Sequence, residues 1–327
     1  MAIRIGLIGA GRMGATTHAP AITVREDVAI TAVYDPLPAA AQGVRDKYHA
    51  AICASAPELA GRADVDAVMI CSPTFAHIEG IRAAATTGKP IFCEKPLCRS
   101  LAEADEILKL LKGYQAPVTV GFVRRHGAGQ QKFHEIVASG VLGTLRVATA
   151  DMMFGAFKRL DGDWFVDFAR SGGMALDMFI HHFDLFNWSF GMPQRVYAQS
   201  SLLSRDQAEP ADYISGTMTF RNGVICNLSG GWQRFGRSNN YMDVYGENGC
   251  VSYKWGVPEV TLTLKGQDPV VYKTPDPLPV FQAEDNVWLD AILGKGKVKV
   301  TVADGVNAVK VALALIESAQ SNRVIEL

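Results

Sequence analysis

The glycine pattern near the N-terminus constrains the fold of this chain most. Residues 9–14 read Gly-Ala-Gly-Arg-Met-Gly, directly after an apolar segment over residues 3–8 and before a helix-like segment. In a strand–loop–helix unit the first glycine allows a sharp turn, the second lets backbone approach a pyrophosphate, and the third lets the helix pack on the strand. Glycine-rich turns are common, but this position predicts a dinucleotide site. The predicted contacts are Gly9, Gly11, Arg12, Met13 and Gly14.

An acidic residue follows at the spacing that nucleotide recognition requires. Asp35 ends the second candidate strand, 21 residues beyond Gly14. At about that separation a carboxylate accepts hydrogen bonds from the ribose hydroxyls of NAD and repels the 2′-phosphate of NADP. NAD is therefore favoured over NADP, although Arg12 or another cation could relax the preference. The alternative is that Asp35, which precedes Pro36, only starts a turn.

The first third of the chain alternates short apolar segments with alanine-rich helical segments. This rhythm predicts βαβ units that build a parallel sheet, and segments that are apolar on both alternations suit strands buried on both faces. Ser100 and Glu103 have the spacing of a capping box at one helix start. The expected strands cover residues 3–8, 29–34, 67–71, 90–93 and 118–122, and the expected helices cover residues 12–24, 37–48, 76–88 and 101–113.

After residue 121 the sequence pattern changes: strand-like segments follow one another with turns, instead of helices, between them. Asn222-Gly223 and Asn248-Gly249 carry the pair that favours tight two-residue turns. These features predict a mostly antiparallel sheet. Its expected strands cover residues 144–153, 195–202, 211–221, 223–232, 241–246, 249–255 and 259–265, with helices over 173–190, 281–293 and 304–321.

Charge and cysteine usage exclude several classes of protein. The 327 residues hold 32 Lys and Arg against 33 Asp and Glu, a net charge of -1, so no overall field attracts nucleic acid or an anionic membrane. No apolar segment is long enough to span a membrane, and Arg4 interrupts the short N-terminal apolar run, unlike a secretion signal. The cysteines lack paired spacing, so we expect reduced thiols, a cytoplasmic location and no metal site.

Two charged residues and a proline end the segment over residues 90–93. Because charge is costly inside a sheet, Glu94 and Lys95 should emerge at the carboxyl end of the strand, where open α/β sheets bind ligands. Pro96 prevents further ladder pairing and restricts Lys95 to extended conformations. The functional interpretation is a lysine aimed into a ligand site. A solvated lysine at a strand end explains the same pattern.

A second group of ionisable residues lies in an apolar helical segment. Asp177, His181 and Asp184 are spaced by four and then three residues, so on a helix they share one stripe, while His182 points elsewhere. A carboxylate beside an imidazole orients the ring and keeps its pKa near or above the usual value, as a base for an alcohol proton requires. Alternatively, Asp177 and His181 satisfy each other in a core.

Taken together, these motifs resemble those of the glucose-fructose oxidoreductase, inositol dehydrogenase and rhizopine-catabolism family, abbreviated Gfo/Idh/MocA, over nearly the whole chain. The resemblance implies an α/β protein in which a doubly wound Rossmann domain, residues 1–121, binds NAD. Residues 122–327 would form a substrate and oligomerisation domain with an open, mostly antiparallel sheet, and the helix over 304–321 would pack back on the first domain. The matching stretches are the glycine loop, Cys71-Ser72-Pro73-Thr74 with His77, Glu94-Lys95-Pro96-Leu97, and Gly172-Gly173 with Asp177, His181 and Asp184.

The resemblance also implies roles for single residues. Lys95 would be the catalytic lysine of the cleft, His181 the acid/base and Asp177 its substrate-binding neighbour. The segment with Ser72, Pro73 and His77, together with Glu94 and Lys95, would border the nicotinamide side of NAD. The open sheet would hold a homodimer or homotetramer together.

A further stretch points to a substrate class within the family. Residues 120–126 are similar to the Gly-Phe-x-Arg-Arg-aromatic run of myo-inositol 2-dehydrogenases, although His126 replaces the aromatic residue and Gly127 the Asp that often follows. If this stretch is extended, Arg124 and Arg125 point to opposite faces. We therefore expect Arg124 to bind substrate and Arg125 to form an outward ion pair.

These interpretations predict NAD-dependent oxidation of a secondary alcohol on a cyclic polyol or sugar. His181 would take the hydroxyl proton, and Lys95 would stabilise the developing alkoxide. Three alternatives within the same fold stay open: a reductase acting on a keto-sugar, an NAD-dependent glycosidase, and a regulator that senses a dinucleotide without turnover. A regulator need not keep Lys95, Asp177 and His181 together.

Overall fold

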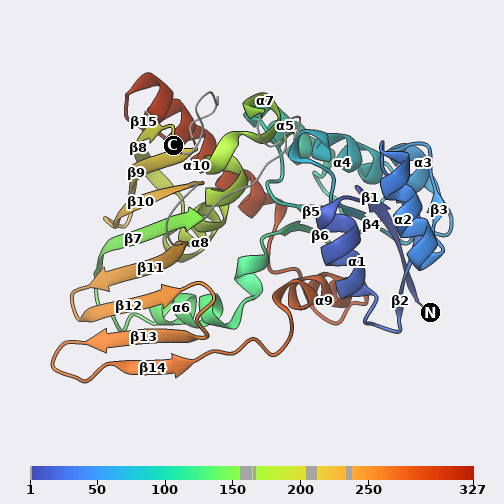
Figure 1. The fold of residues 1–327 in the computed structure, drawn as a ribbon. Coiled ribbons are helices and arrows are strands. Elements are labelled where there is room, and N and C mark those ends of the chain that lie inside the picture. The colour runs from blue at the N-terminus through green and yellow to red at the C-terminus, as the bar shows by residue number, and fades with distance from the viewer. Residues whose placement is uncertain (1, 155–163, 165–166, 204–211, 233–237) are drawn as a thin grey trace. The chain divides into compact units, whose positions relative to one another are not determined.

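The computed structural model describes residues 2–154, 164, 167–203, 212–232 and 238–327 (Figure 1). The chain forms two compact units, one of residues Met1–Val123 with Leu278–Val306, the other of Arg124–Pro277 with Asn307–Leu327. The predicted division at residues 121 and 122 lies close to the first crossing of the chain. The return of Leu278–Val306 to the first unit was not predicted. Of the helix predicted over residues 304–321, the part from Asn307 onward belongs to the second unit.

The first unit is built on a six-stranded sheet in the order β3-β2-β1-β4-β5-β6. All of its pairings are parallel, as predicted. The strands are β1 Ile3–Ile8, β2 Val28–Tyr34, β3 Ala51–Ile52, β4 Ala67–Ile70, β5 Ile91–Glu94 and β6 Val118–Gly121. Every residue of β4 and β5 is buried, the pattern of parallel strands covered on both faces.

The helices of the first unit follow the strands closely. The glycine loop leads into the π-helical segment η1, Arg12–His18, which continues as α1, Ala19–Ile22. Ser100 Oγ accepts a hydrogen bond from Glu103 N at 3.2 Å at the start of α5, as the capping spacing predicts. The other helices are α2 Pro38–Tyr48, α3 Ala56–Gly61, the short 3-10 turn η2 Thr74–Ala76, α4 His77–Ala85, α5 Leu101–Leu110 and α9 Val280–Ile292.

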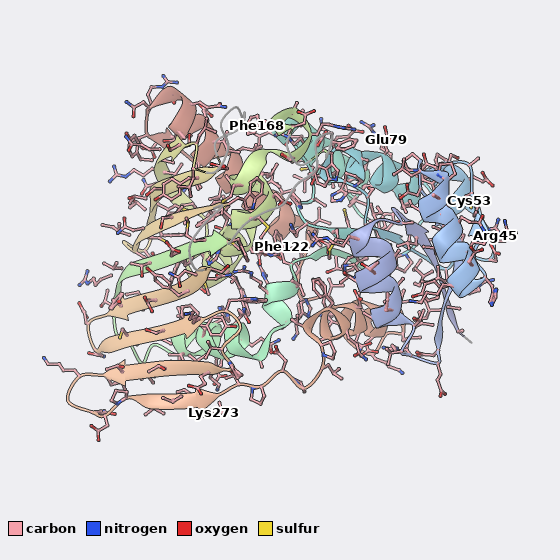
Figure 2. All side chains as sticks on the ribbon, viewed as in Figure 1. Arg45, Cys53, Glu79, Phe122, Phe168 and Lys273 are labelled. Atoms are coloured by element: carbon pink, nitrogen blue, oxygen red, sulfur yellow. The ribbon has the colours of Figure 1, made fainter. Side chains whose placement is uncertain are left out.

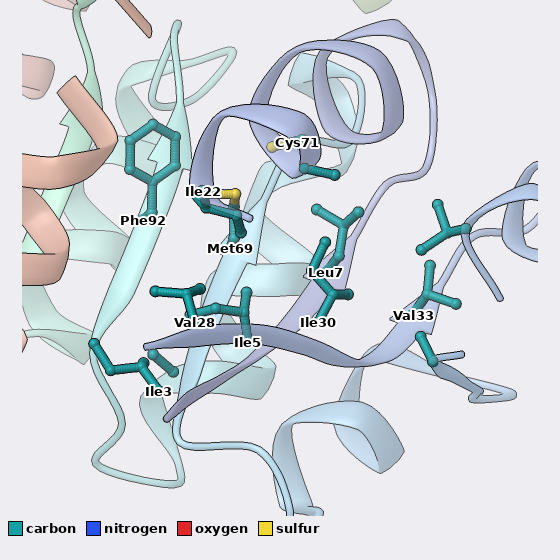
Figure 3. Close-up of a cluster of buried hydrophobic side chains, with 14 of the residues drawn as sticks. Ile3, Ile5, Leu7, Ile22, Val28, Ile30, Val33, Met69, Cys71 and Phe92 are labelled. Carbon is teal, nitrogen blue, oxygen red and sulfur yellow. The ribbon is translucent and has the colours of Figure 1, made fainter. Parts of the chain in front are cut away.

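Side chains from both strands and helices form the core of the first unit. Figure 3 shows Leu7 and Ile30 on adjacent strands and Met69 on β4 beside Ile22 of α1. The cluster also takes in Trp288 and Leu289 from α9, so the returning segment completes this core. Burial of large apolar side chains is the main stabilising contribution to such a layer.

The second unit carries a nine-stranded sheet in the order β14-β13-β12-β11-β7-β10-β9-β8-β15. It is mostly antiparallel, as predicted, but β7 and β10 pair in parallel. Gly246 lies opposite Gly249, so Glu247 and Asn248 form the predicted two-residue turn. The strands are β7 Leu145–Phe154, β8 Pro193–Ser201, β9 Tyr213–Phe220, β10 Ile225–Trp232, β11 Asn239–Gly246, β12 Gly249–Lys254, β13 Glu259–Leu264, β14 Val270–Lys273 and β15 Ile325–Glu326.

Helices pack on this sheet while its outer strands stay short. The helix predicted over 173–190 is split into the π-helical segment η5, Ala175–Phe179, and α8, Ile180–Phe190. Figure 2 places Lys273 on β14, an edge strand of four residues, and a short edge with a lysine resists pairing with other chains. The remaining helical segments are η3 Val123–His126, α6 Ala128–Ala138, α7 Phe168–Ser171 and α10 Val302–Ser321.

Candidate active site

The glycine loop has the close approaches that its spacing predicts. Gly9 has a φ of +91°, and a Cβ there would lie 2.4 Å from Ser72 N. A Cβ on Gly14 would lie 1.9 Å from Gly9 O, so the third glycine lets η1 start against the loop. Gly11 differs, because a Cβ there would meet nothing within 4 Å. The loop is therefore tightly packed at Gly9 and Gly14 and open at Gly11.

Several features of this loop fit a bound dinucleotide. The first turn of η1 carries no acidic residue, so its N-terminus is free to attract phosphate. The Ser72 hydroxyl is buried and lacks a hydrogen-bond partner among the described residues, which a ligand would satisfy. Arg12 is exposed, whereas the half-buried Met13 packs against the core. Met13 can therefore contribute to a cofactor site mainly through its backbone.

Asp35 lies beside the glycine loop. Its Oδ2 accepts a hydrogen bond from Ala10 N at 2.7 Å, and its Oδ1 accepts one from Leu37 N at 2.8 Å. The carboxylate thus starts a turn, as one interpretation predicted, and also links that turn to the loop. The half-buried side chain lies at the end of β2, where ribose recognition was predicted. Its contact with a ribose stays a prediction.

His77 connects the loop after β4 to the segment after β5. Its Nε2 lies 2.8 Å from Ser72 O, and its Nδ1 lies 2.7 Å from Pro96 O. Burial is the main cause that lowers the pKa of His77. A carbonyl oxygen lies at hydrogen-bond distance from each ring nitrogen, and the neutral ring donates to one of them. His77 thereby orders the predicted nicotinamide border, including Ser72 and Pro73.

Glu94 and Lys95, at the end of β5, differ in burial. Lys95 is half-buried directly after the strand, but Glu94 is only 4% exposed and does not emerge as expected. Its Oε1 lies 2.8 Å from His18 Nε2, and its Oε2 accepts a hydrogen bond from Lys95 N at 2.7 Å. A buried ion pair thus explains why Glu94 points inward. Both of its oxygens are engaged within the protein, which does not favour its predicted cofactor contact.

In the second unit, Asp177 lies on η5 and His181 on α8. They are 4% and 8% exposed, so both are buried as expected for ionisable groups in an apolar helix. The π-helical turn between them departs from the regular helical spacing assumed for a single stripe. His182 points elsewhere, as predicted: it is fully buried and stacks on Phe179 with ring centroids 5.2 Å apart. Burial and then the Arg124 charge lower the pKa of His182 well below its ordinary value.

The two arginines do not lie on an extended segment. Val123–His126 is a 3-10 helix, and both side chains are buried. Arg125 is therefore not an outward residue: its Nη2 and Nε donate to Asp184 Oδ1 and Oδ2 at 2.6 and 2.8 Å. The predicted ion pair exists, but inside the protein. Sequence spacing does not reveal it, because Arg125 and Asp184 lie 59 residues apart.

Arg124 has a different environment. Its guanidinium lies 4.6 Å from the centroid of the Trp255 ring, and its Nη1 lies 3.4 Å from Asn240 Oδ1. Burial lowers the pKa of Arg124 to about 9. Within the described chain no carboxylate forms an ion pair with it. A buried cation with so few protein acceptors fits a role in holding a polar ligand.

Sequence reasoning missed His18 and Asp285. The sequence pattern assigns no role to His18, yet it is fully buried between Glu94 and Asp285. The one available signal was Glu94 itself, because a carboxylate in a buried strand needs a counter-charge. Asp285, the second partner of His18, lies 267 residues further along the chain, and no local pattern shows such a pairing.

No helix among the described residues is long and apolar enough to cross a membrane.

Comparisons with known proteins agree with this geometry. Residues 3–122 match the model of the oxidoreductase family with an NAD-binding Rossmann fold, GFO_IDH_MocA, and residues 130–252 match the GFO/IDH/MocA C-terminal domain. Inositol 2-dehydrogenase of Rhizobium meliloti (strain 1021) is 30% identical over 256 residues, which cover 77% of this chain and 76% of that protein. Myo-inositol 2-dehydrogenase of Thermotoga maritima is 30% identical over 271 residues, with 80% and 78% covered.

A solved structure extends the likeness to the whole fold. Aldose-aldose oxidoreductase from Caulobacter crescentus superposes with a TM-score of 0.88 over 100% of both chains, at 21% identity. At that identity the likeness supports the fold alone. The family models, however, match both halves of the chain in the expected order. The chain therefore belongs to the Gfo/Idh/MocA oxidoreductase family and is an oxidoreductase that binds NAD through a Rossmann domain.

Proposed function

We propose that this enzyme oxidises a secondary alcohol on a cyclic polyol or sugar. The observation that carries the proposal is the edge of the first sheet, where Gly9, Ser72 and Lys95 follow the carboxyl ends of β1, β4 and β5. His77 joins two of these segments through Ser72 O and Pro96 O. Ligands of open α/β sheets bind at this edge. The arrangement provides one cation in the region where a nicotinamide would lie.

Each residue has a distinct part in the proposed reaction. Bound NAD supplies the hydride acceptor. Lys95 would stabilise charge that develops on the reacting oxygen, an effect typically worth a few kcal/mol. His181 would accept the hydroxyl proton, and Asp177 would orient His181 and accept from a neighbouring hydroxyl. Arg124 would donate hydrogen bonds to another part of the substrate.

Steady-state kinetics test this assignment. Inositols and aldoses are assayed with NAD and with NADP by the absorbance of the reduced cofactor, and we expect turnover with NAD and a cyclic polyol or sugar. Lys95→Met or His181→Ala should lower kcat by about 10²-fold or more, while calorimetry shows retained NAD binding. Lys109→Met, on the exposed face of α5, is the matched control. Near-normal turnover in either active-site variant would contradict its assigned role.

We also propose that the exposed face of the nine-stranded sheet joins copies of this chain into a homodimer or homotetramer. Thr149, Thr217 and Tyr241 are half-buried on this face and line a shallow hollow together with Gln199 and Ser229. Light scattering after size exclusion tests the assembly. Thr217→Arg should produce smaller species, and a monomeric wild-type protein would contradict the proposal.

A further inference from the structure

The first unit contains a buried row of charged groups that the proposed reaction does not use. His18 Nδ1 lies 2.9 Å from Asp285 Oδ1 and 3.1 Å from Asp285 Oδ2. On the other side of the ring, His18 Nε2 lies 2.8 Å from Glu94 Oε1. Glu94 Oε2 then accepts the hydrogen bond from Lys95 N. The row therefore ends on the backbone of the proposed catalytic lysine.

Burial and hydrogen-bond geometry favour a protonated His18 in this row, even though burial raises the pKa of Asp285. His18 and Asp285 are 0% exposed and Glu94 is 4% exposed. An imidazole can donate to two ionised carboxylates only when both nitrogens carry protons. Although burial, the largest influence, lowers the pKa of His18, Asp285 and Glu94 together raise it well above its ordinary value. Burial raises the pKa of Glu94, but His18 and then Lys95 outweigh it and lower the pKa.

The carboxylate of Glu94 is confined by the neighbouring strand as well. A Cβ on Gly121 of β6 would lie 3.2 Å from Cα, Cδ and Oε2 of Glu94. The rings of Phe92 and Phe281 meet His18 in edge-to-face geometry, with centroids 4.9 and 5.5 Å away. A glycine on β6 and two aromatic rings thus leave the carboxylate and the imidazole little room to move.

We propose that His18 and Asp285 are positioning residues that act on Lys95 through Glu94. Asp285 orients His18, and His18 holds the Glu94 carboxylate where it accepts from Lys95 N. The backbone that carries the Lys95 ammonium is thereby fixed to η1, which begins in the glycine loop. This inference rests on the proposed role of Lys95. Its position matters because a displacement of about 1 Å at a catalytic group can cost 10²-fold in rate.

His18 and Asp285, together with the neighbouring Glu284, suit the ionic row better than a metal ion. Ligand atoms of His18, Glu284 and Asp285 lie within 4.8 Å of one another. A histidine binds a metal through an unprotonated ring nitrogen, however, and both nitrogens of His18 face carboxylates at hydrogen-bond distance. The carboxylates of the ionic row therefore occupy both ring nitrogens that His18 could offer to a metal ion.

Kinetics with matched variants test the positioning role. Asp285→Asn disturbs Glu94 through His18, and Gly121→Ala crowds Glu94 directly. Each should lower kcat by about 10-fold or more, with KM for NAD changed less than about threefold. Thr119→Val is the control, because Thr119 Oγ1 donates to Val300 O at 2.9 Å and so also links β6 to the returning segment. It does not touch the ionic row, and its kcat should stay within about twofold of wild type.

A second measurement does not depend on turnover. In protein labelled with ¹⁵N-lysine, the amide signal of Lys95 is identified by its loss in Lys95→Met. We expect this signal to move in Asp285→Asn and in His18→Gln, and to stay in place in Thr119→Val. An unmoved signal, or wild-type kcat in both Asp285→Asn and Gly121→Ala, would overturn the positioning role. If Lys95→Met itself keeps turnover, the proposed function fails instead, and the amide signal still reports on the row.

Discussion

The buried pair of Arg125 and Asp184 provides a quantitative test of how the second unit is held together. Its side chains are 5% and 1% exposed and form two parallel hydrogen bonds. The guanidinium also lies 5.3 Å from the centroid of the Trp188 ring. Arg125→Met keeps an unbranched chain against Trp188 but leaves the Asp184 carboxylate without this partner. Asp184→Leu creates the converse defect.

The size of the effect follows from burial. Removing one member of a buried ion pair costs about 3–5 kcal/mol, because the remaining charge stays desolvated. Replacing both members by apolar residues of similar volume is typically neutral or stabilising by about 1–4 kcal/mol. The double variant Arg125→Met/Asp184→Leu should therefore be more stable than either single variant. For a unit of this size, each single variant should lower the melting temperature by roughly 6 to 20 °C.

Urea and thermal unfolding of the four proteins, followed by circular dichroism and by tryptophan fluorescence, measure this double-mutant cycle. Two probes are needed because a chain of two units need not unfold in one step. The reasoning would be refuted if the two single losses simply added in the double variant, or if each single variant lost less than about 1 kcal/mol.

Three further predictions concern the first unit. Asp35→Ala should weaken NAD binding and reduce discrimination against NADP in calorimetric titrations; unchanged preference would remove Asp35 from the cofactor site. Gly14→Ala should destabilise the protein by about 1–3 kcal/mol in urea unfolding and impair NAD binding, because its Cβ would meet Gly9 O at 1.9 Å; wild-type values would contradict this close approach. His18, faced by Glu94, Asp285 and the nearby Glu284, has a raised pKa, so its charge stabilises the fold fully below about pH 6.5 and less as pH rises through the raised value. The stability advantage of wild type over His18→Gln should therefore shrink in alkaline buffer; a constant difference would argue against a charged His18.

Local patterns predict the regular parts of this fold well. Apolar runs bounded by glycine and charge predict β1 at its observed ends, Ile3–Ile8, and place the other long strands within a few residues. The helix α6 was not predicted, although Phe133, Ile136 and Val137 form its buried face. From the sequence alone, Gly129 in the first turn of α6 argues against a helix. In the structure that glycine admits the Tyr253 ring, since a Cβ would lie 2.4 Å from Cε2.

Only part of the candidate site can be predicted from the sequence. Gly9, Gly14 and Lys95 can be, because strand ends and turns impose local rules on them. The ionic partners cannot be, because Asp285 pairs with His18 across 267 residues and Asp184 with Arg125 across 59. Such pairs follow from which segments the folded chain brings together. Periodicity carries no information about that choice.

The return of Leu278–Val306 has a consequence for how this protein can be made or dissected. The second unit interrupts the first, so the ribosome completes the dinucleotide-binding unit only after it has synthesised Arg124–Pro277 of the second unit. A gene fragment that stops after β6 would encode all six parallel strands yet omit α9, leaving Trp288, Leu289 and the aspartate beside His18 unmade. Any attempt to express a minimal nucleotide-binding module must therefore graft that distant helix back on.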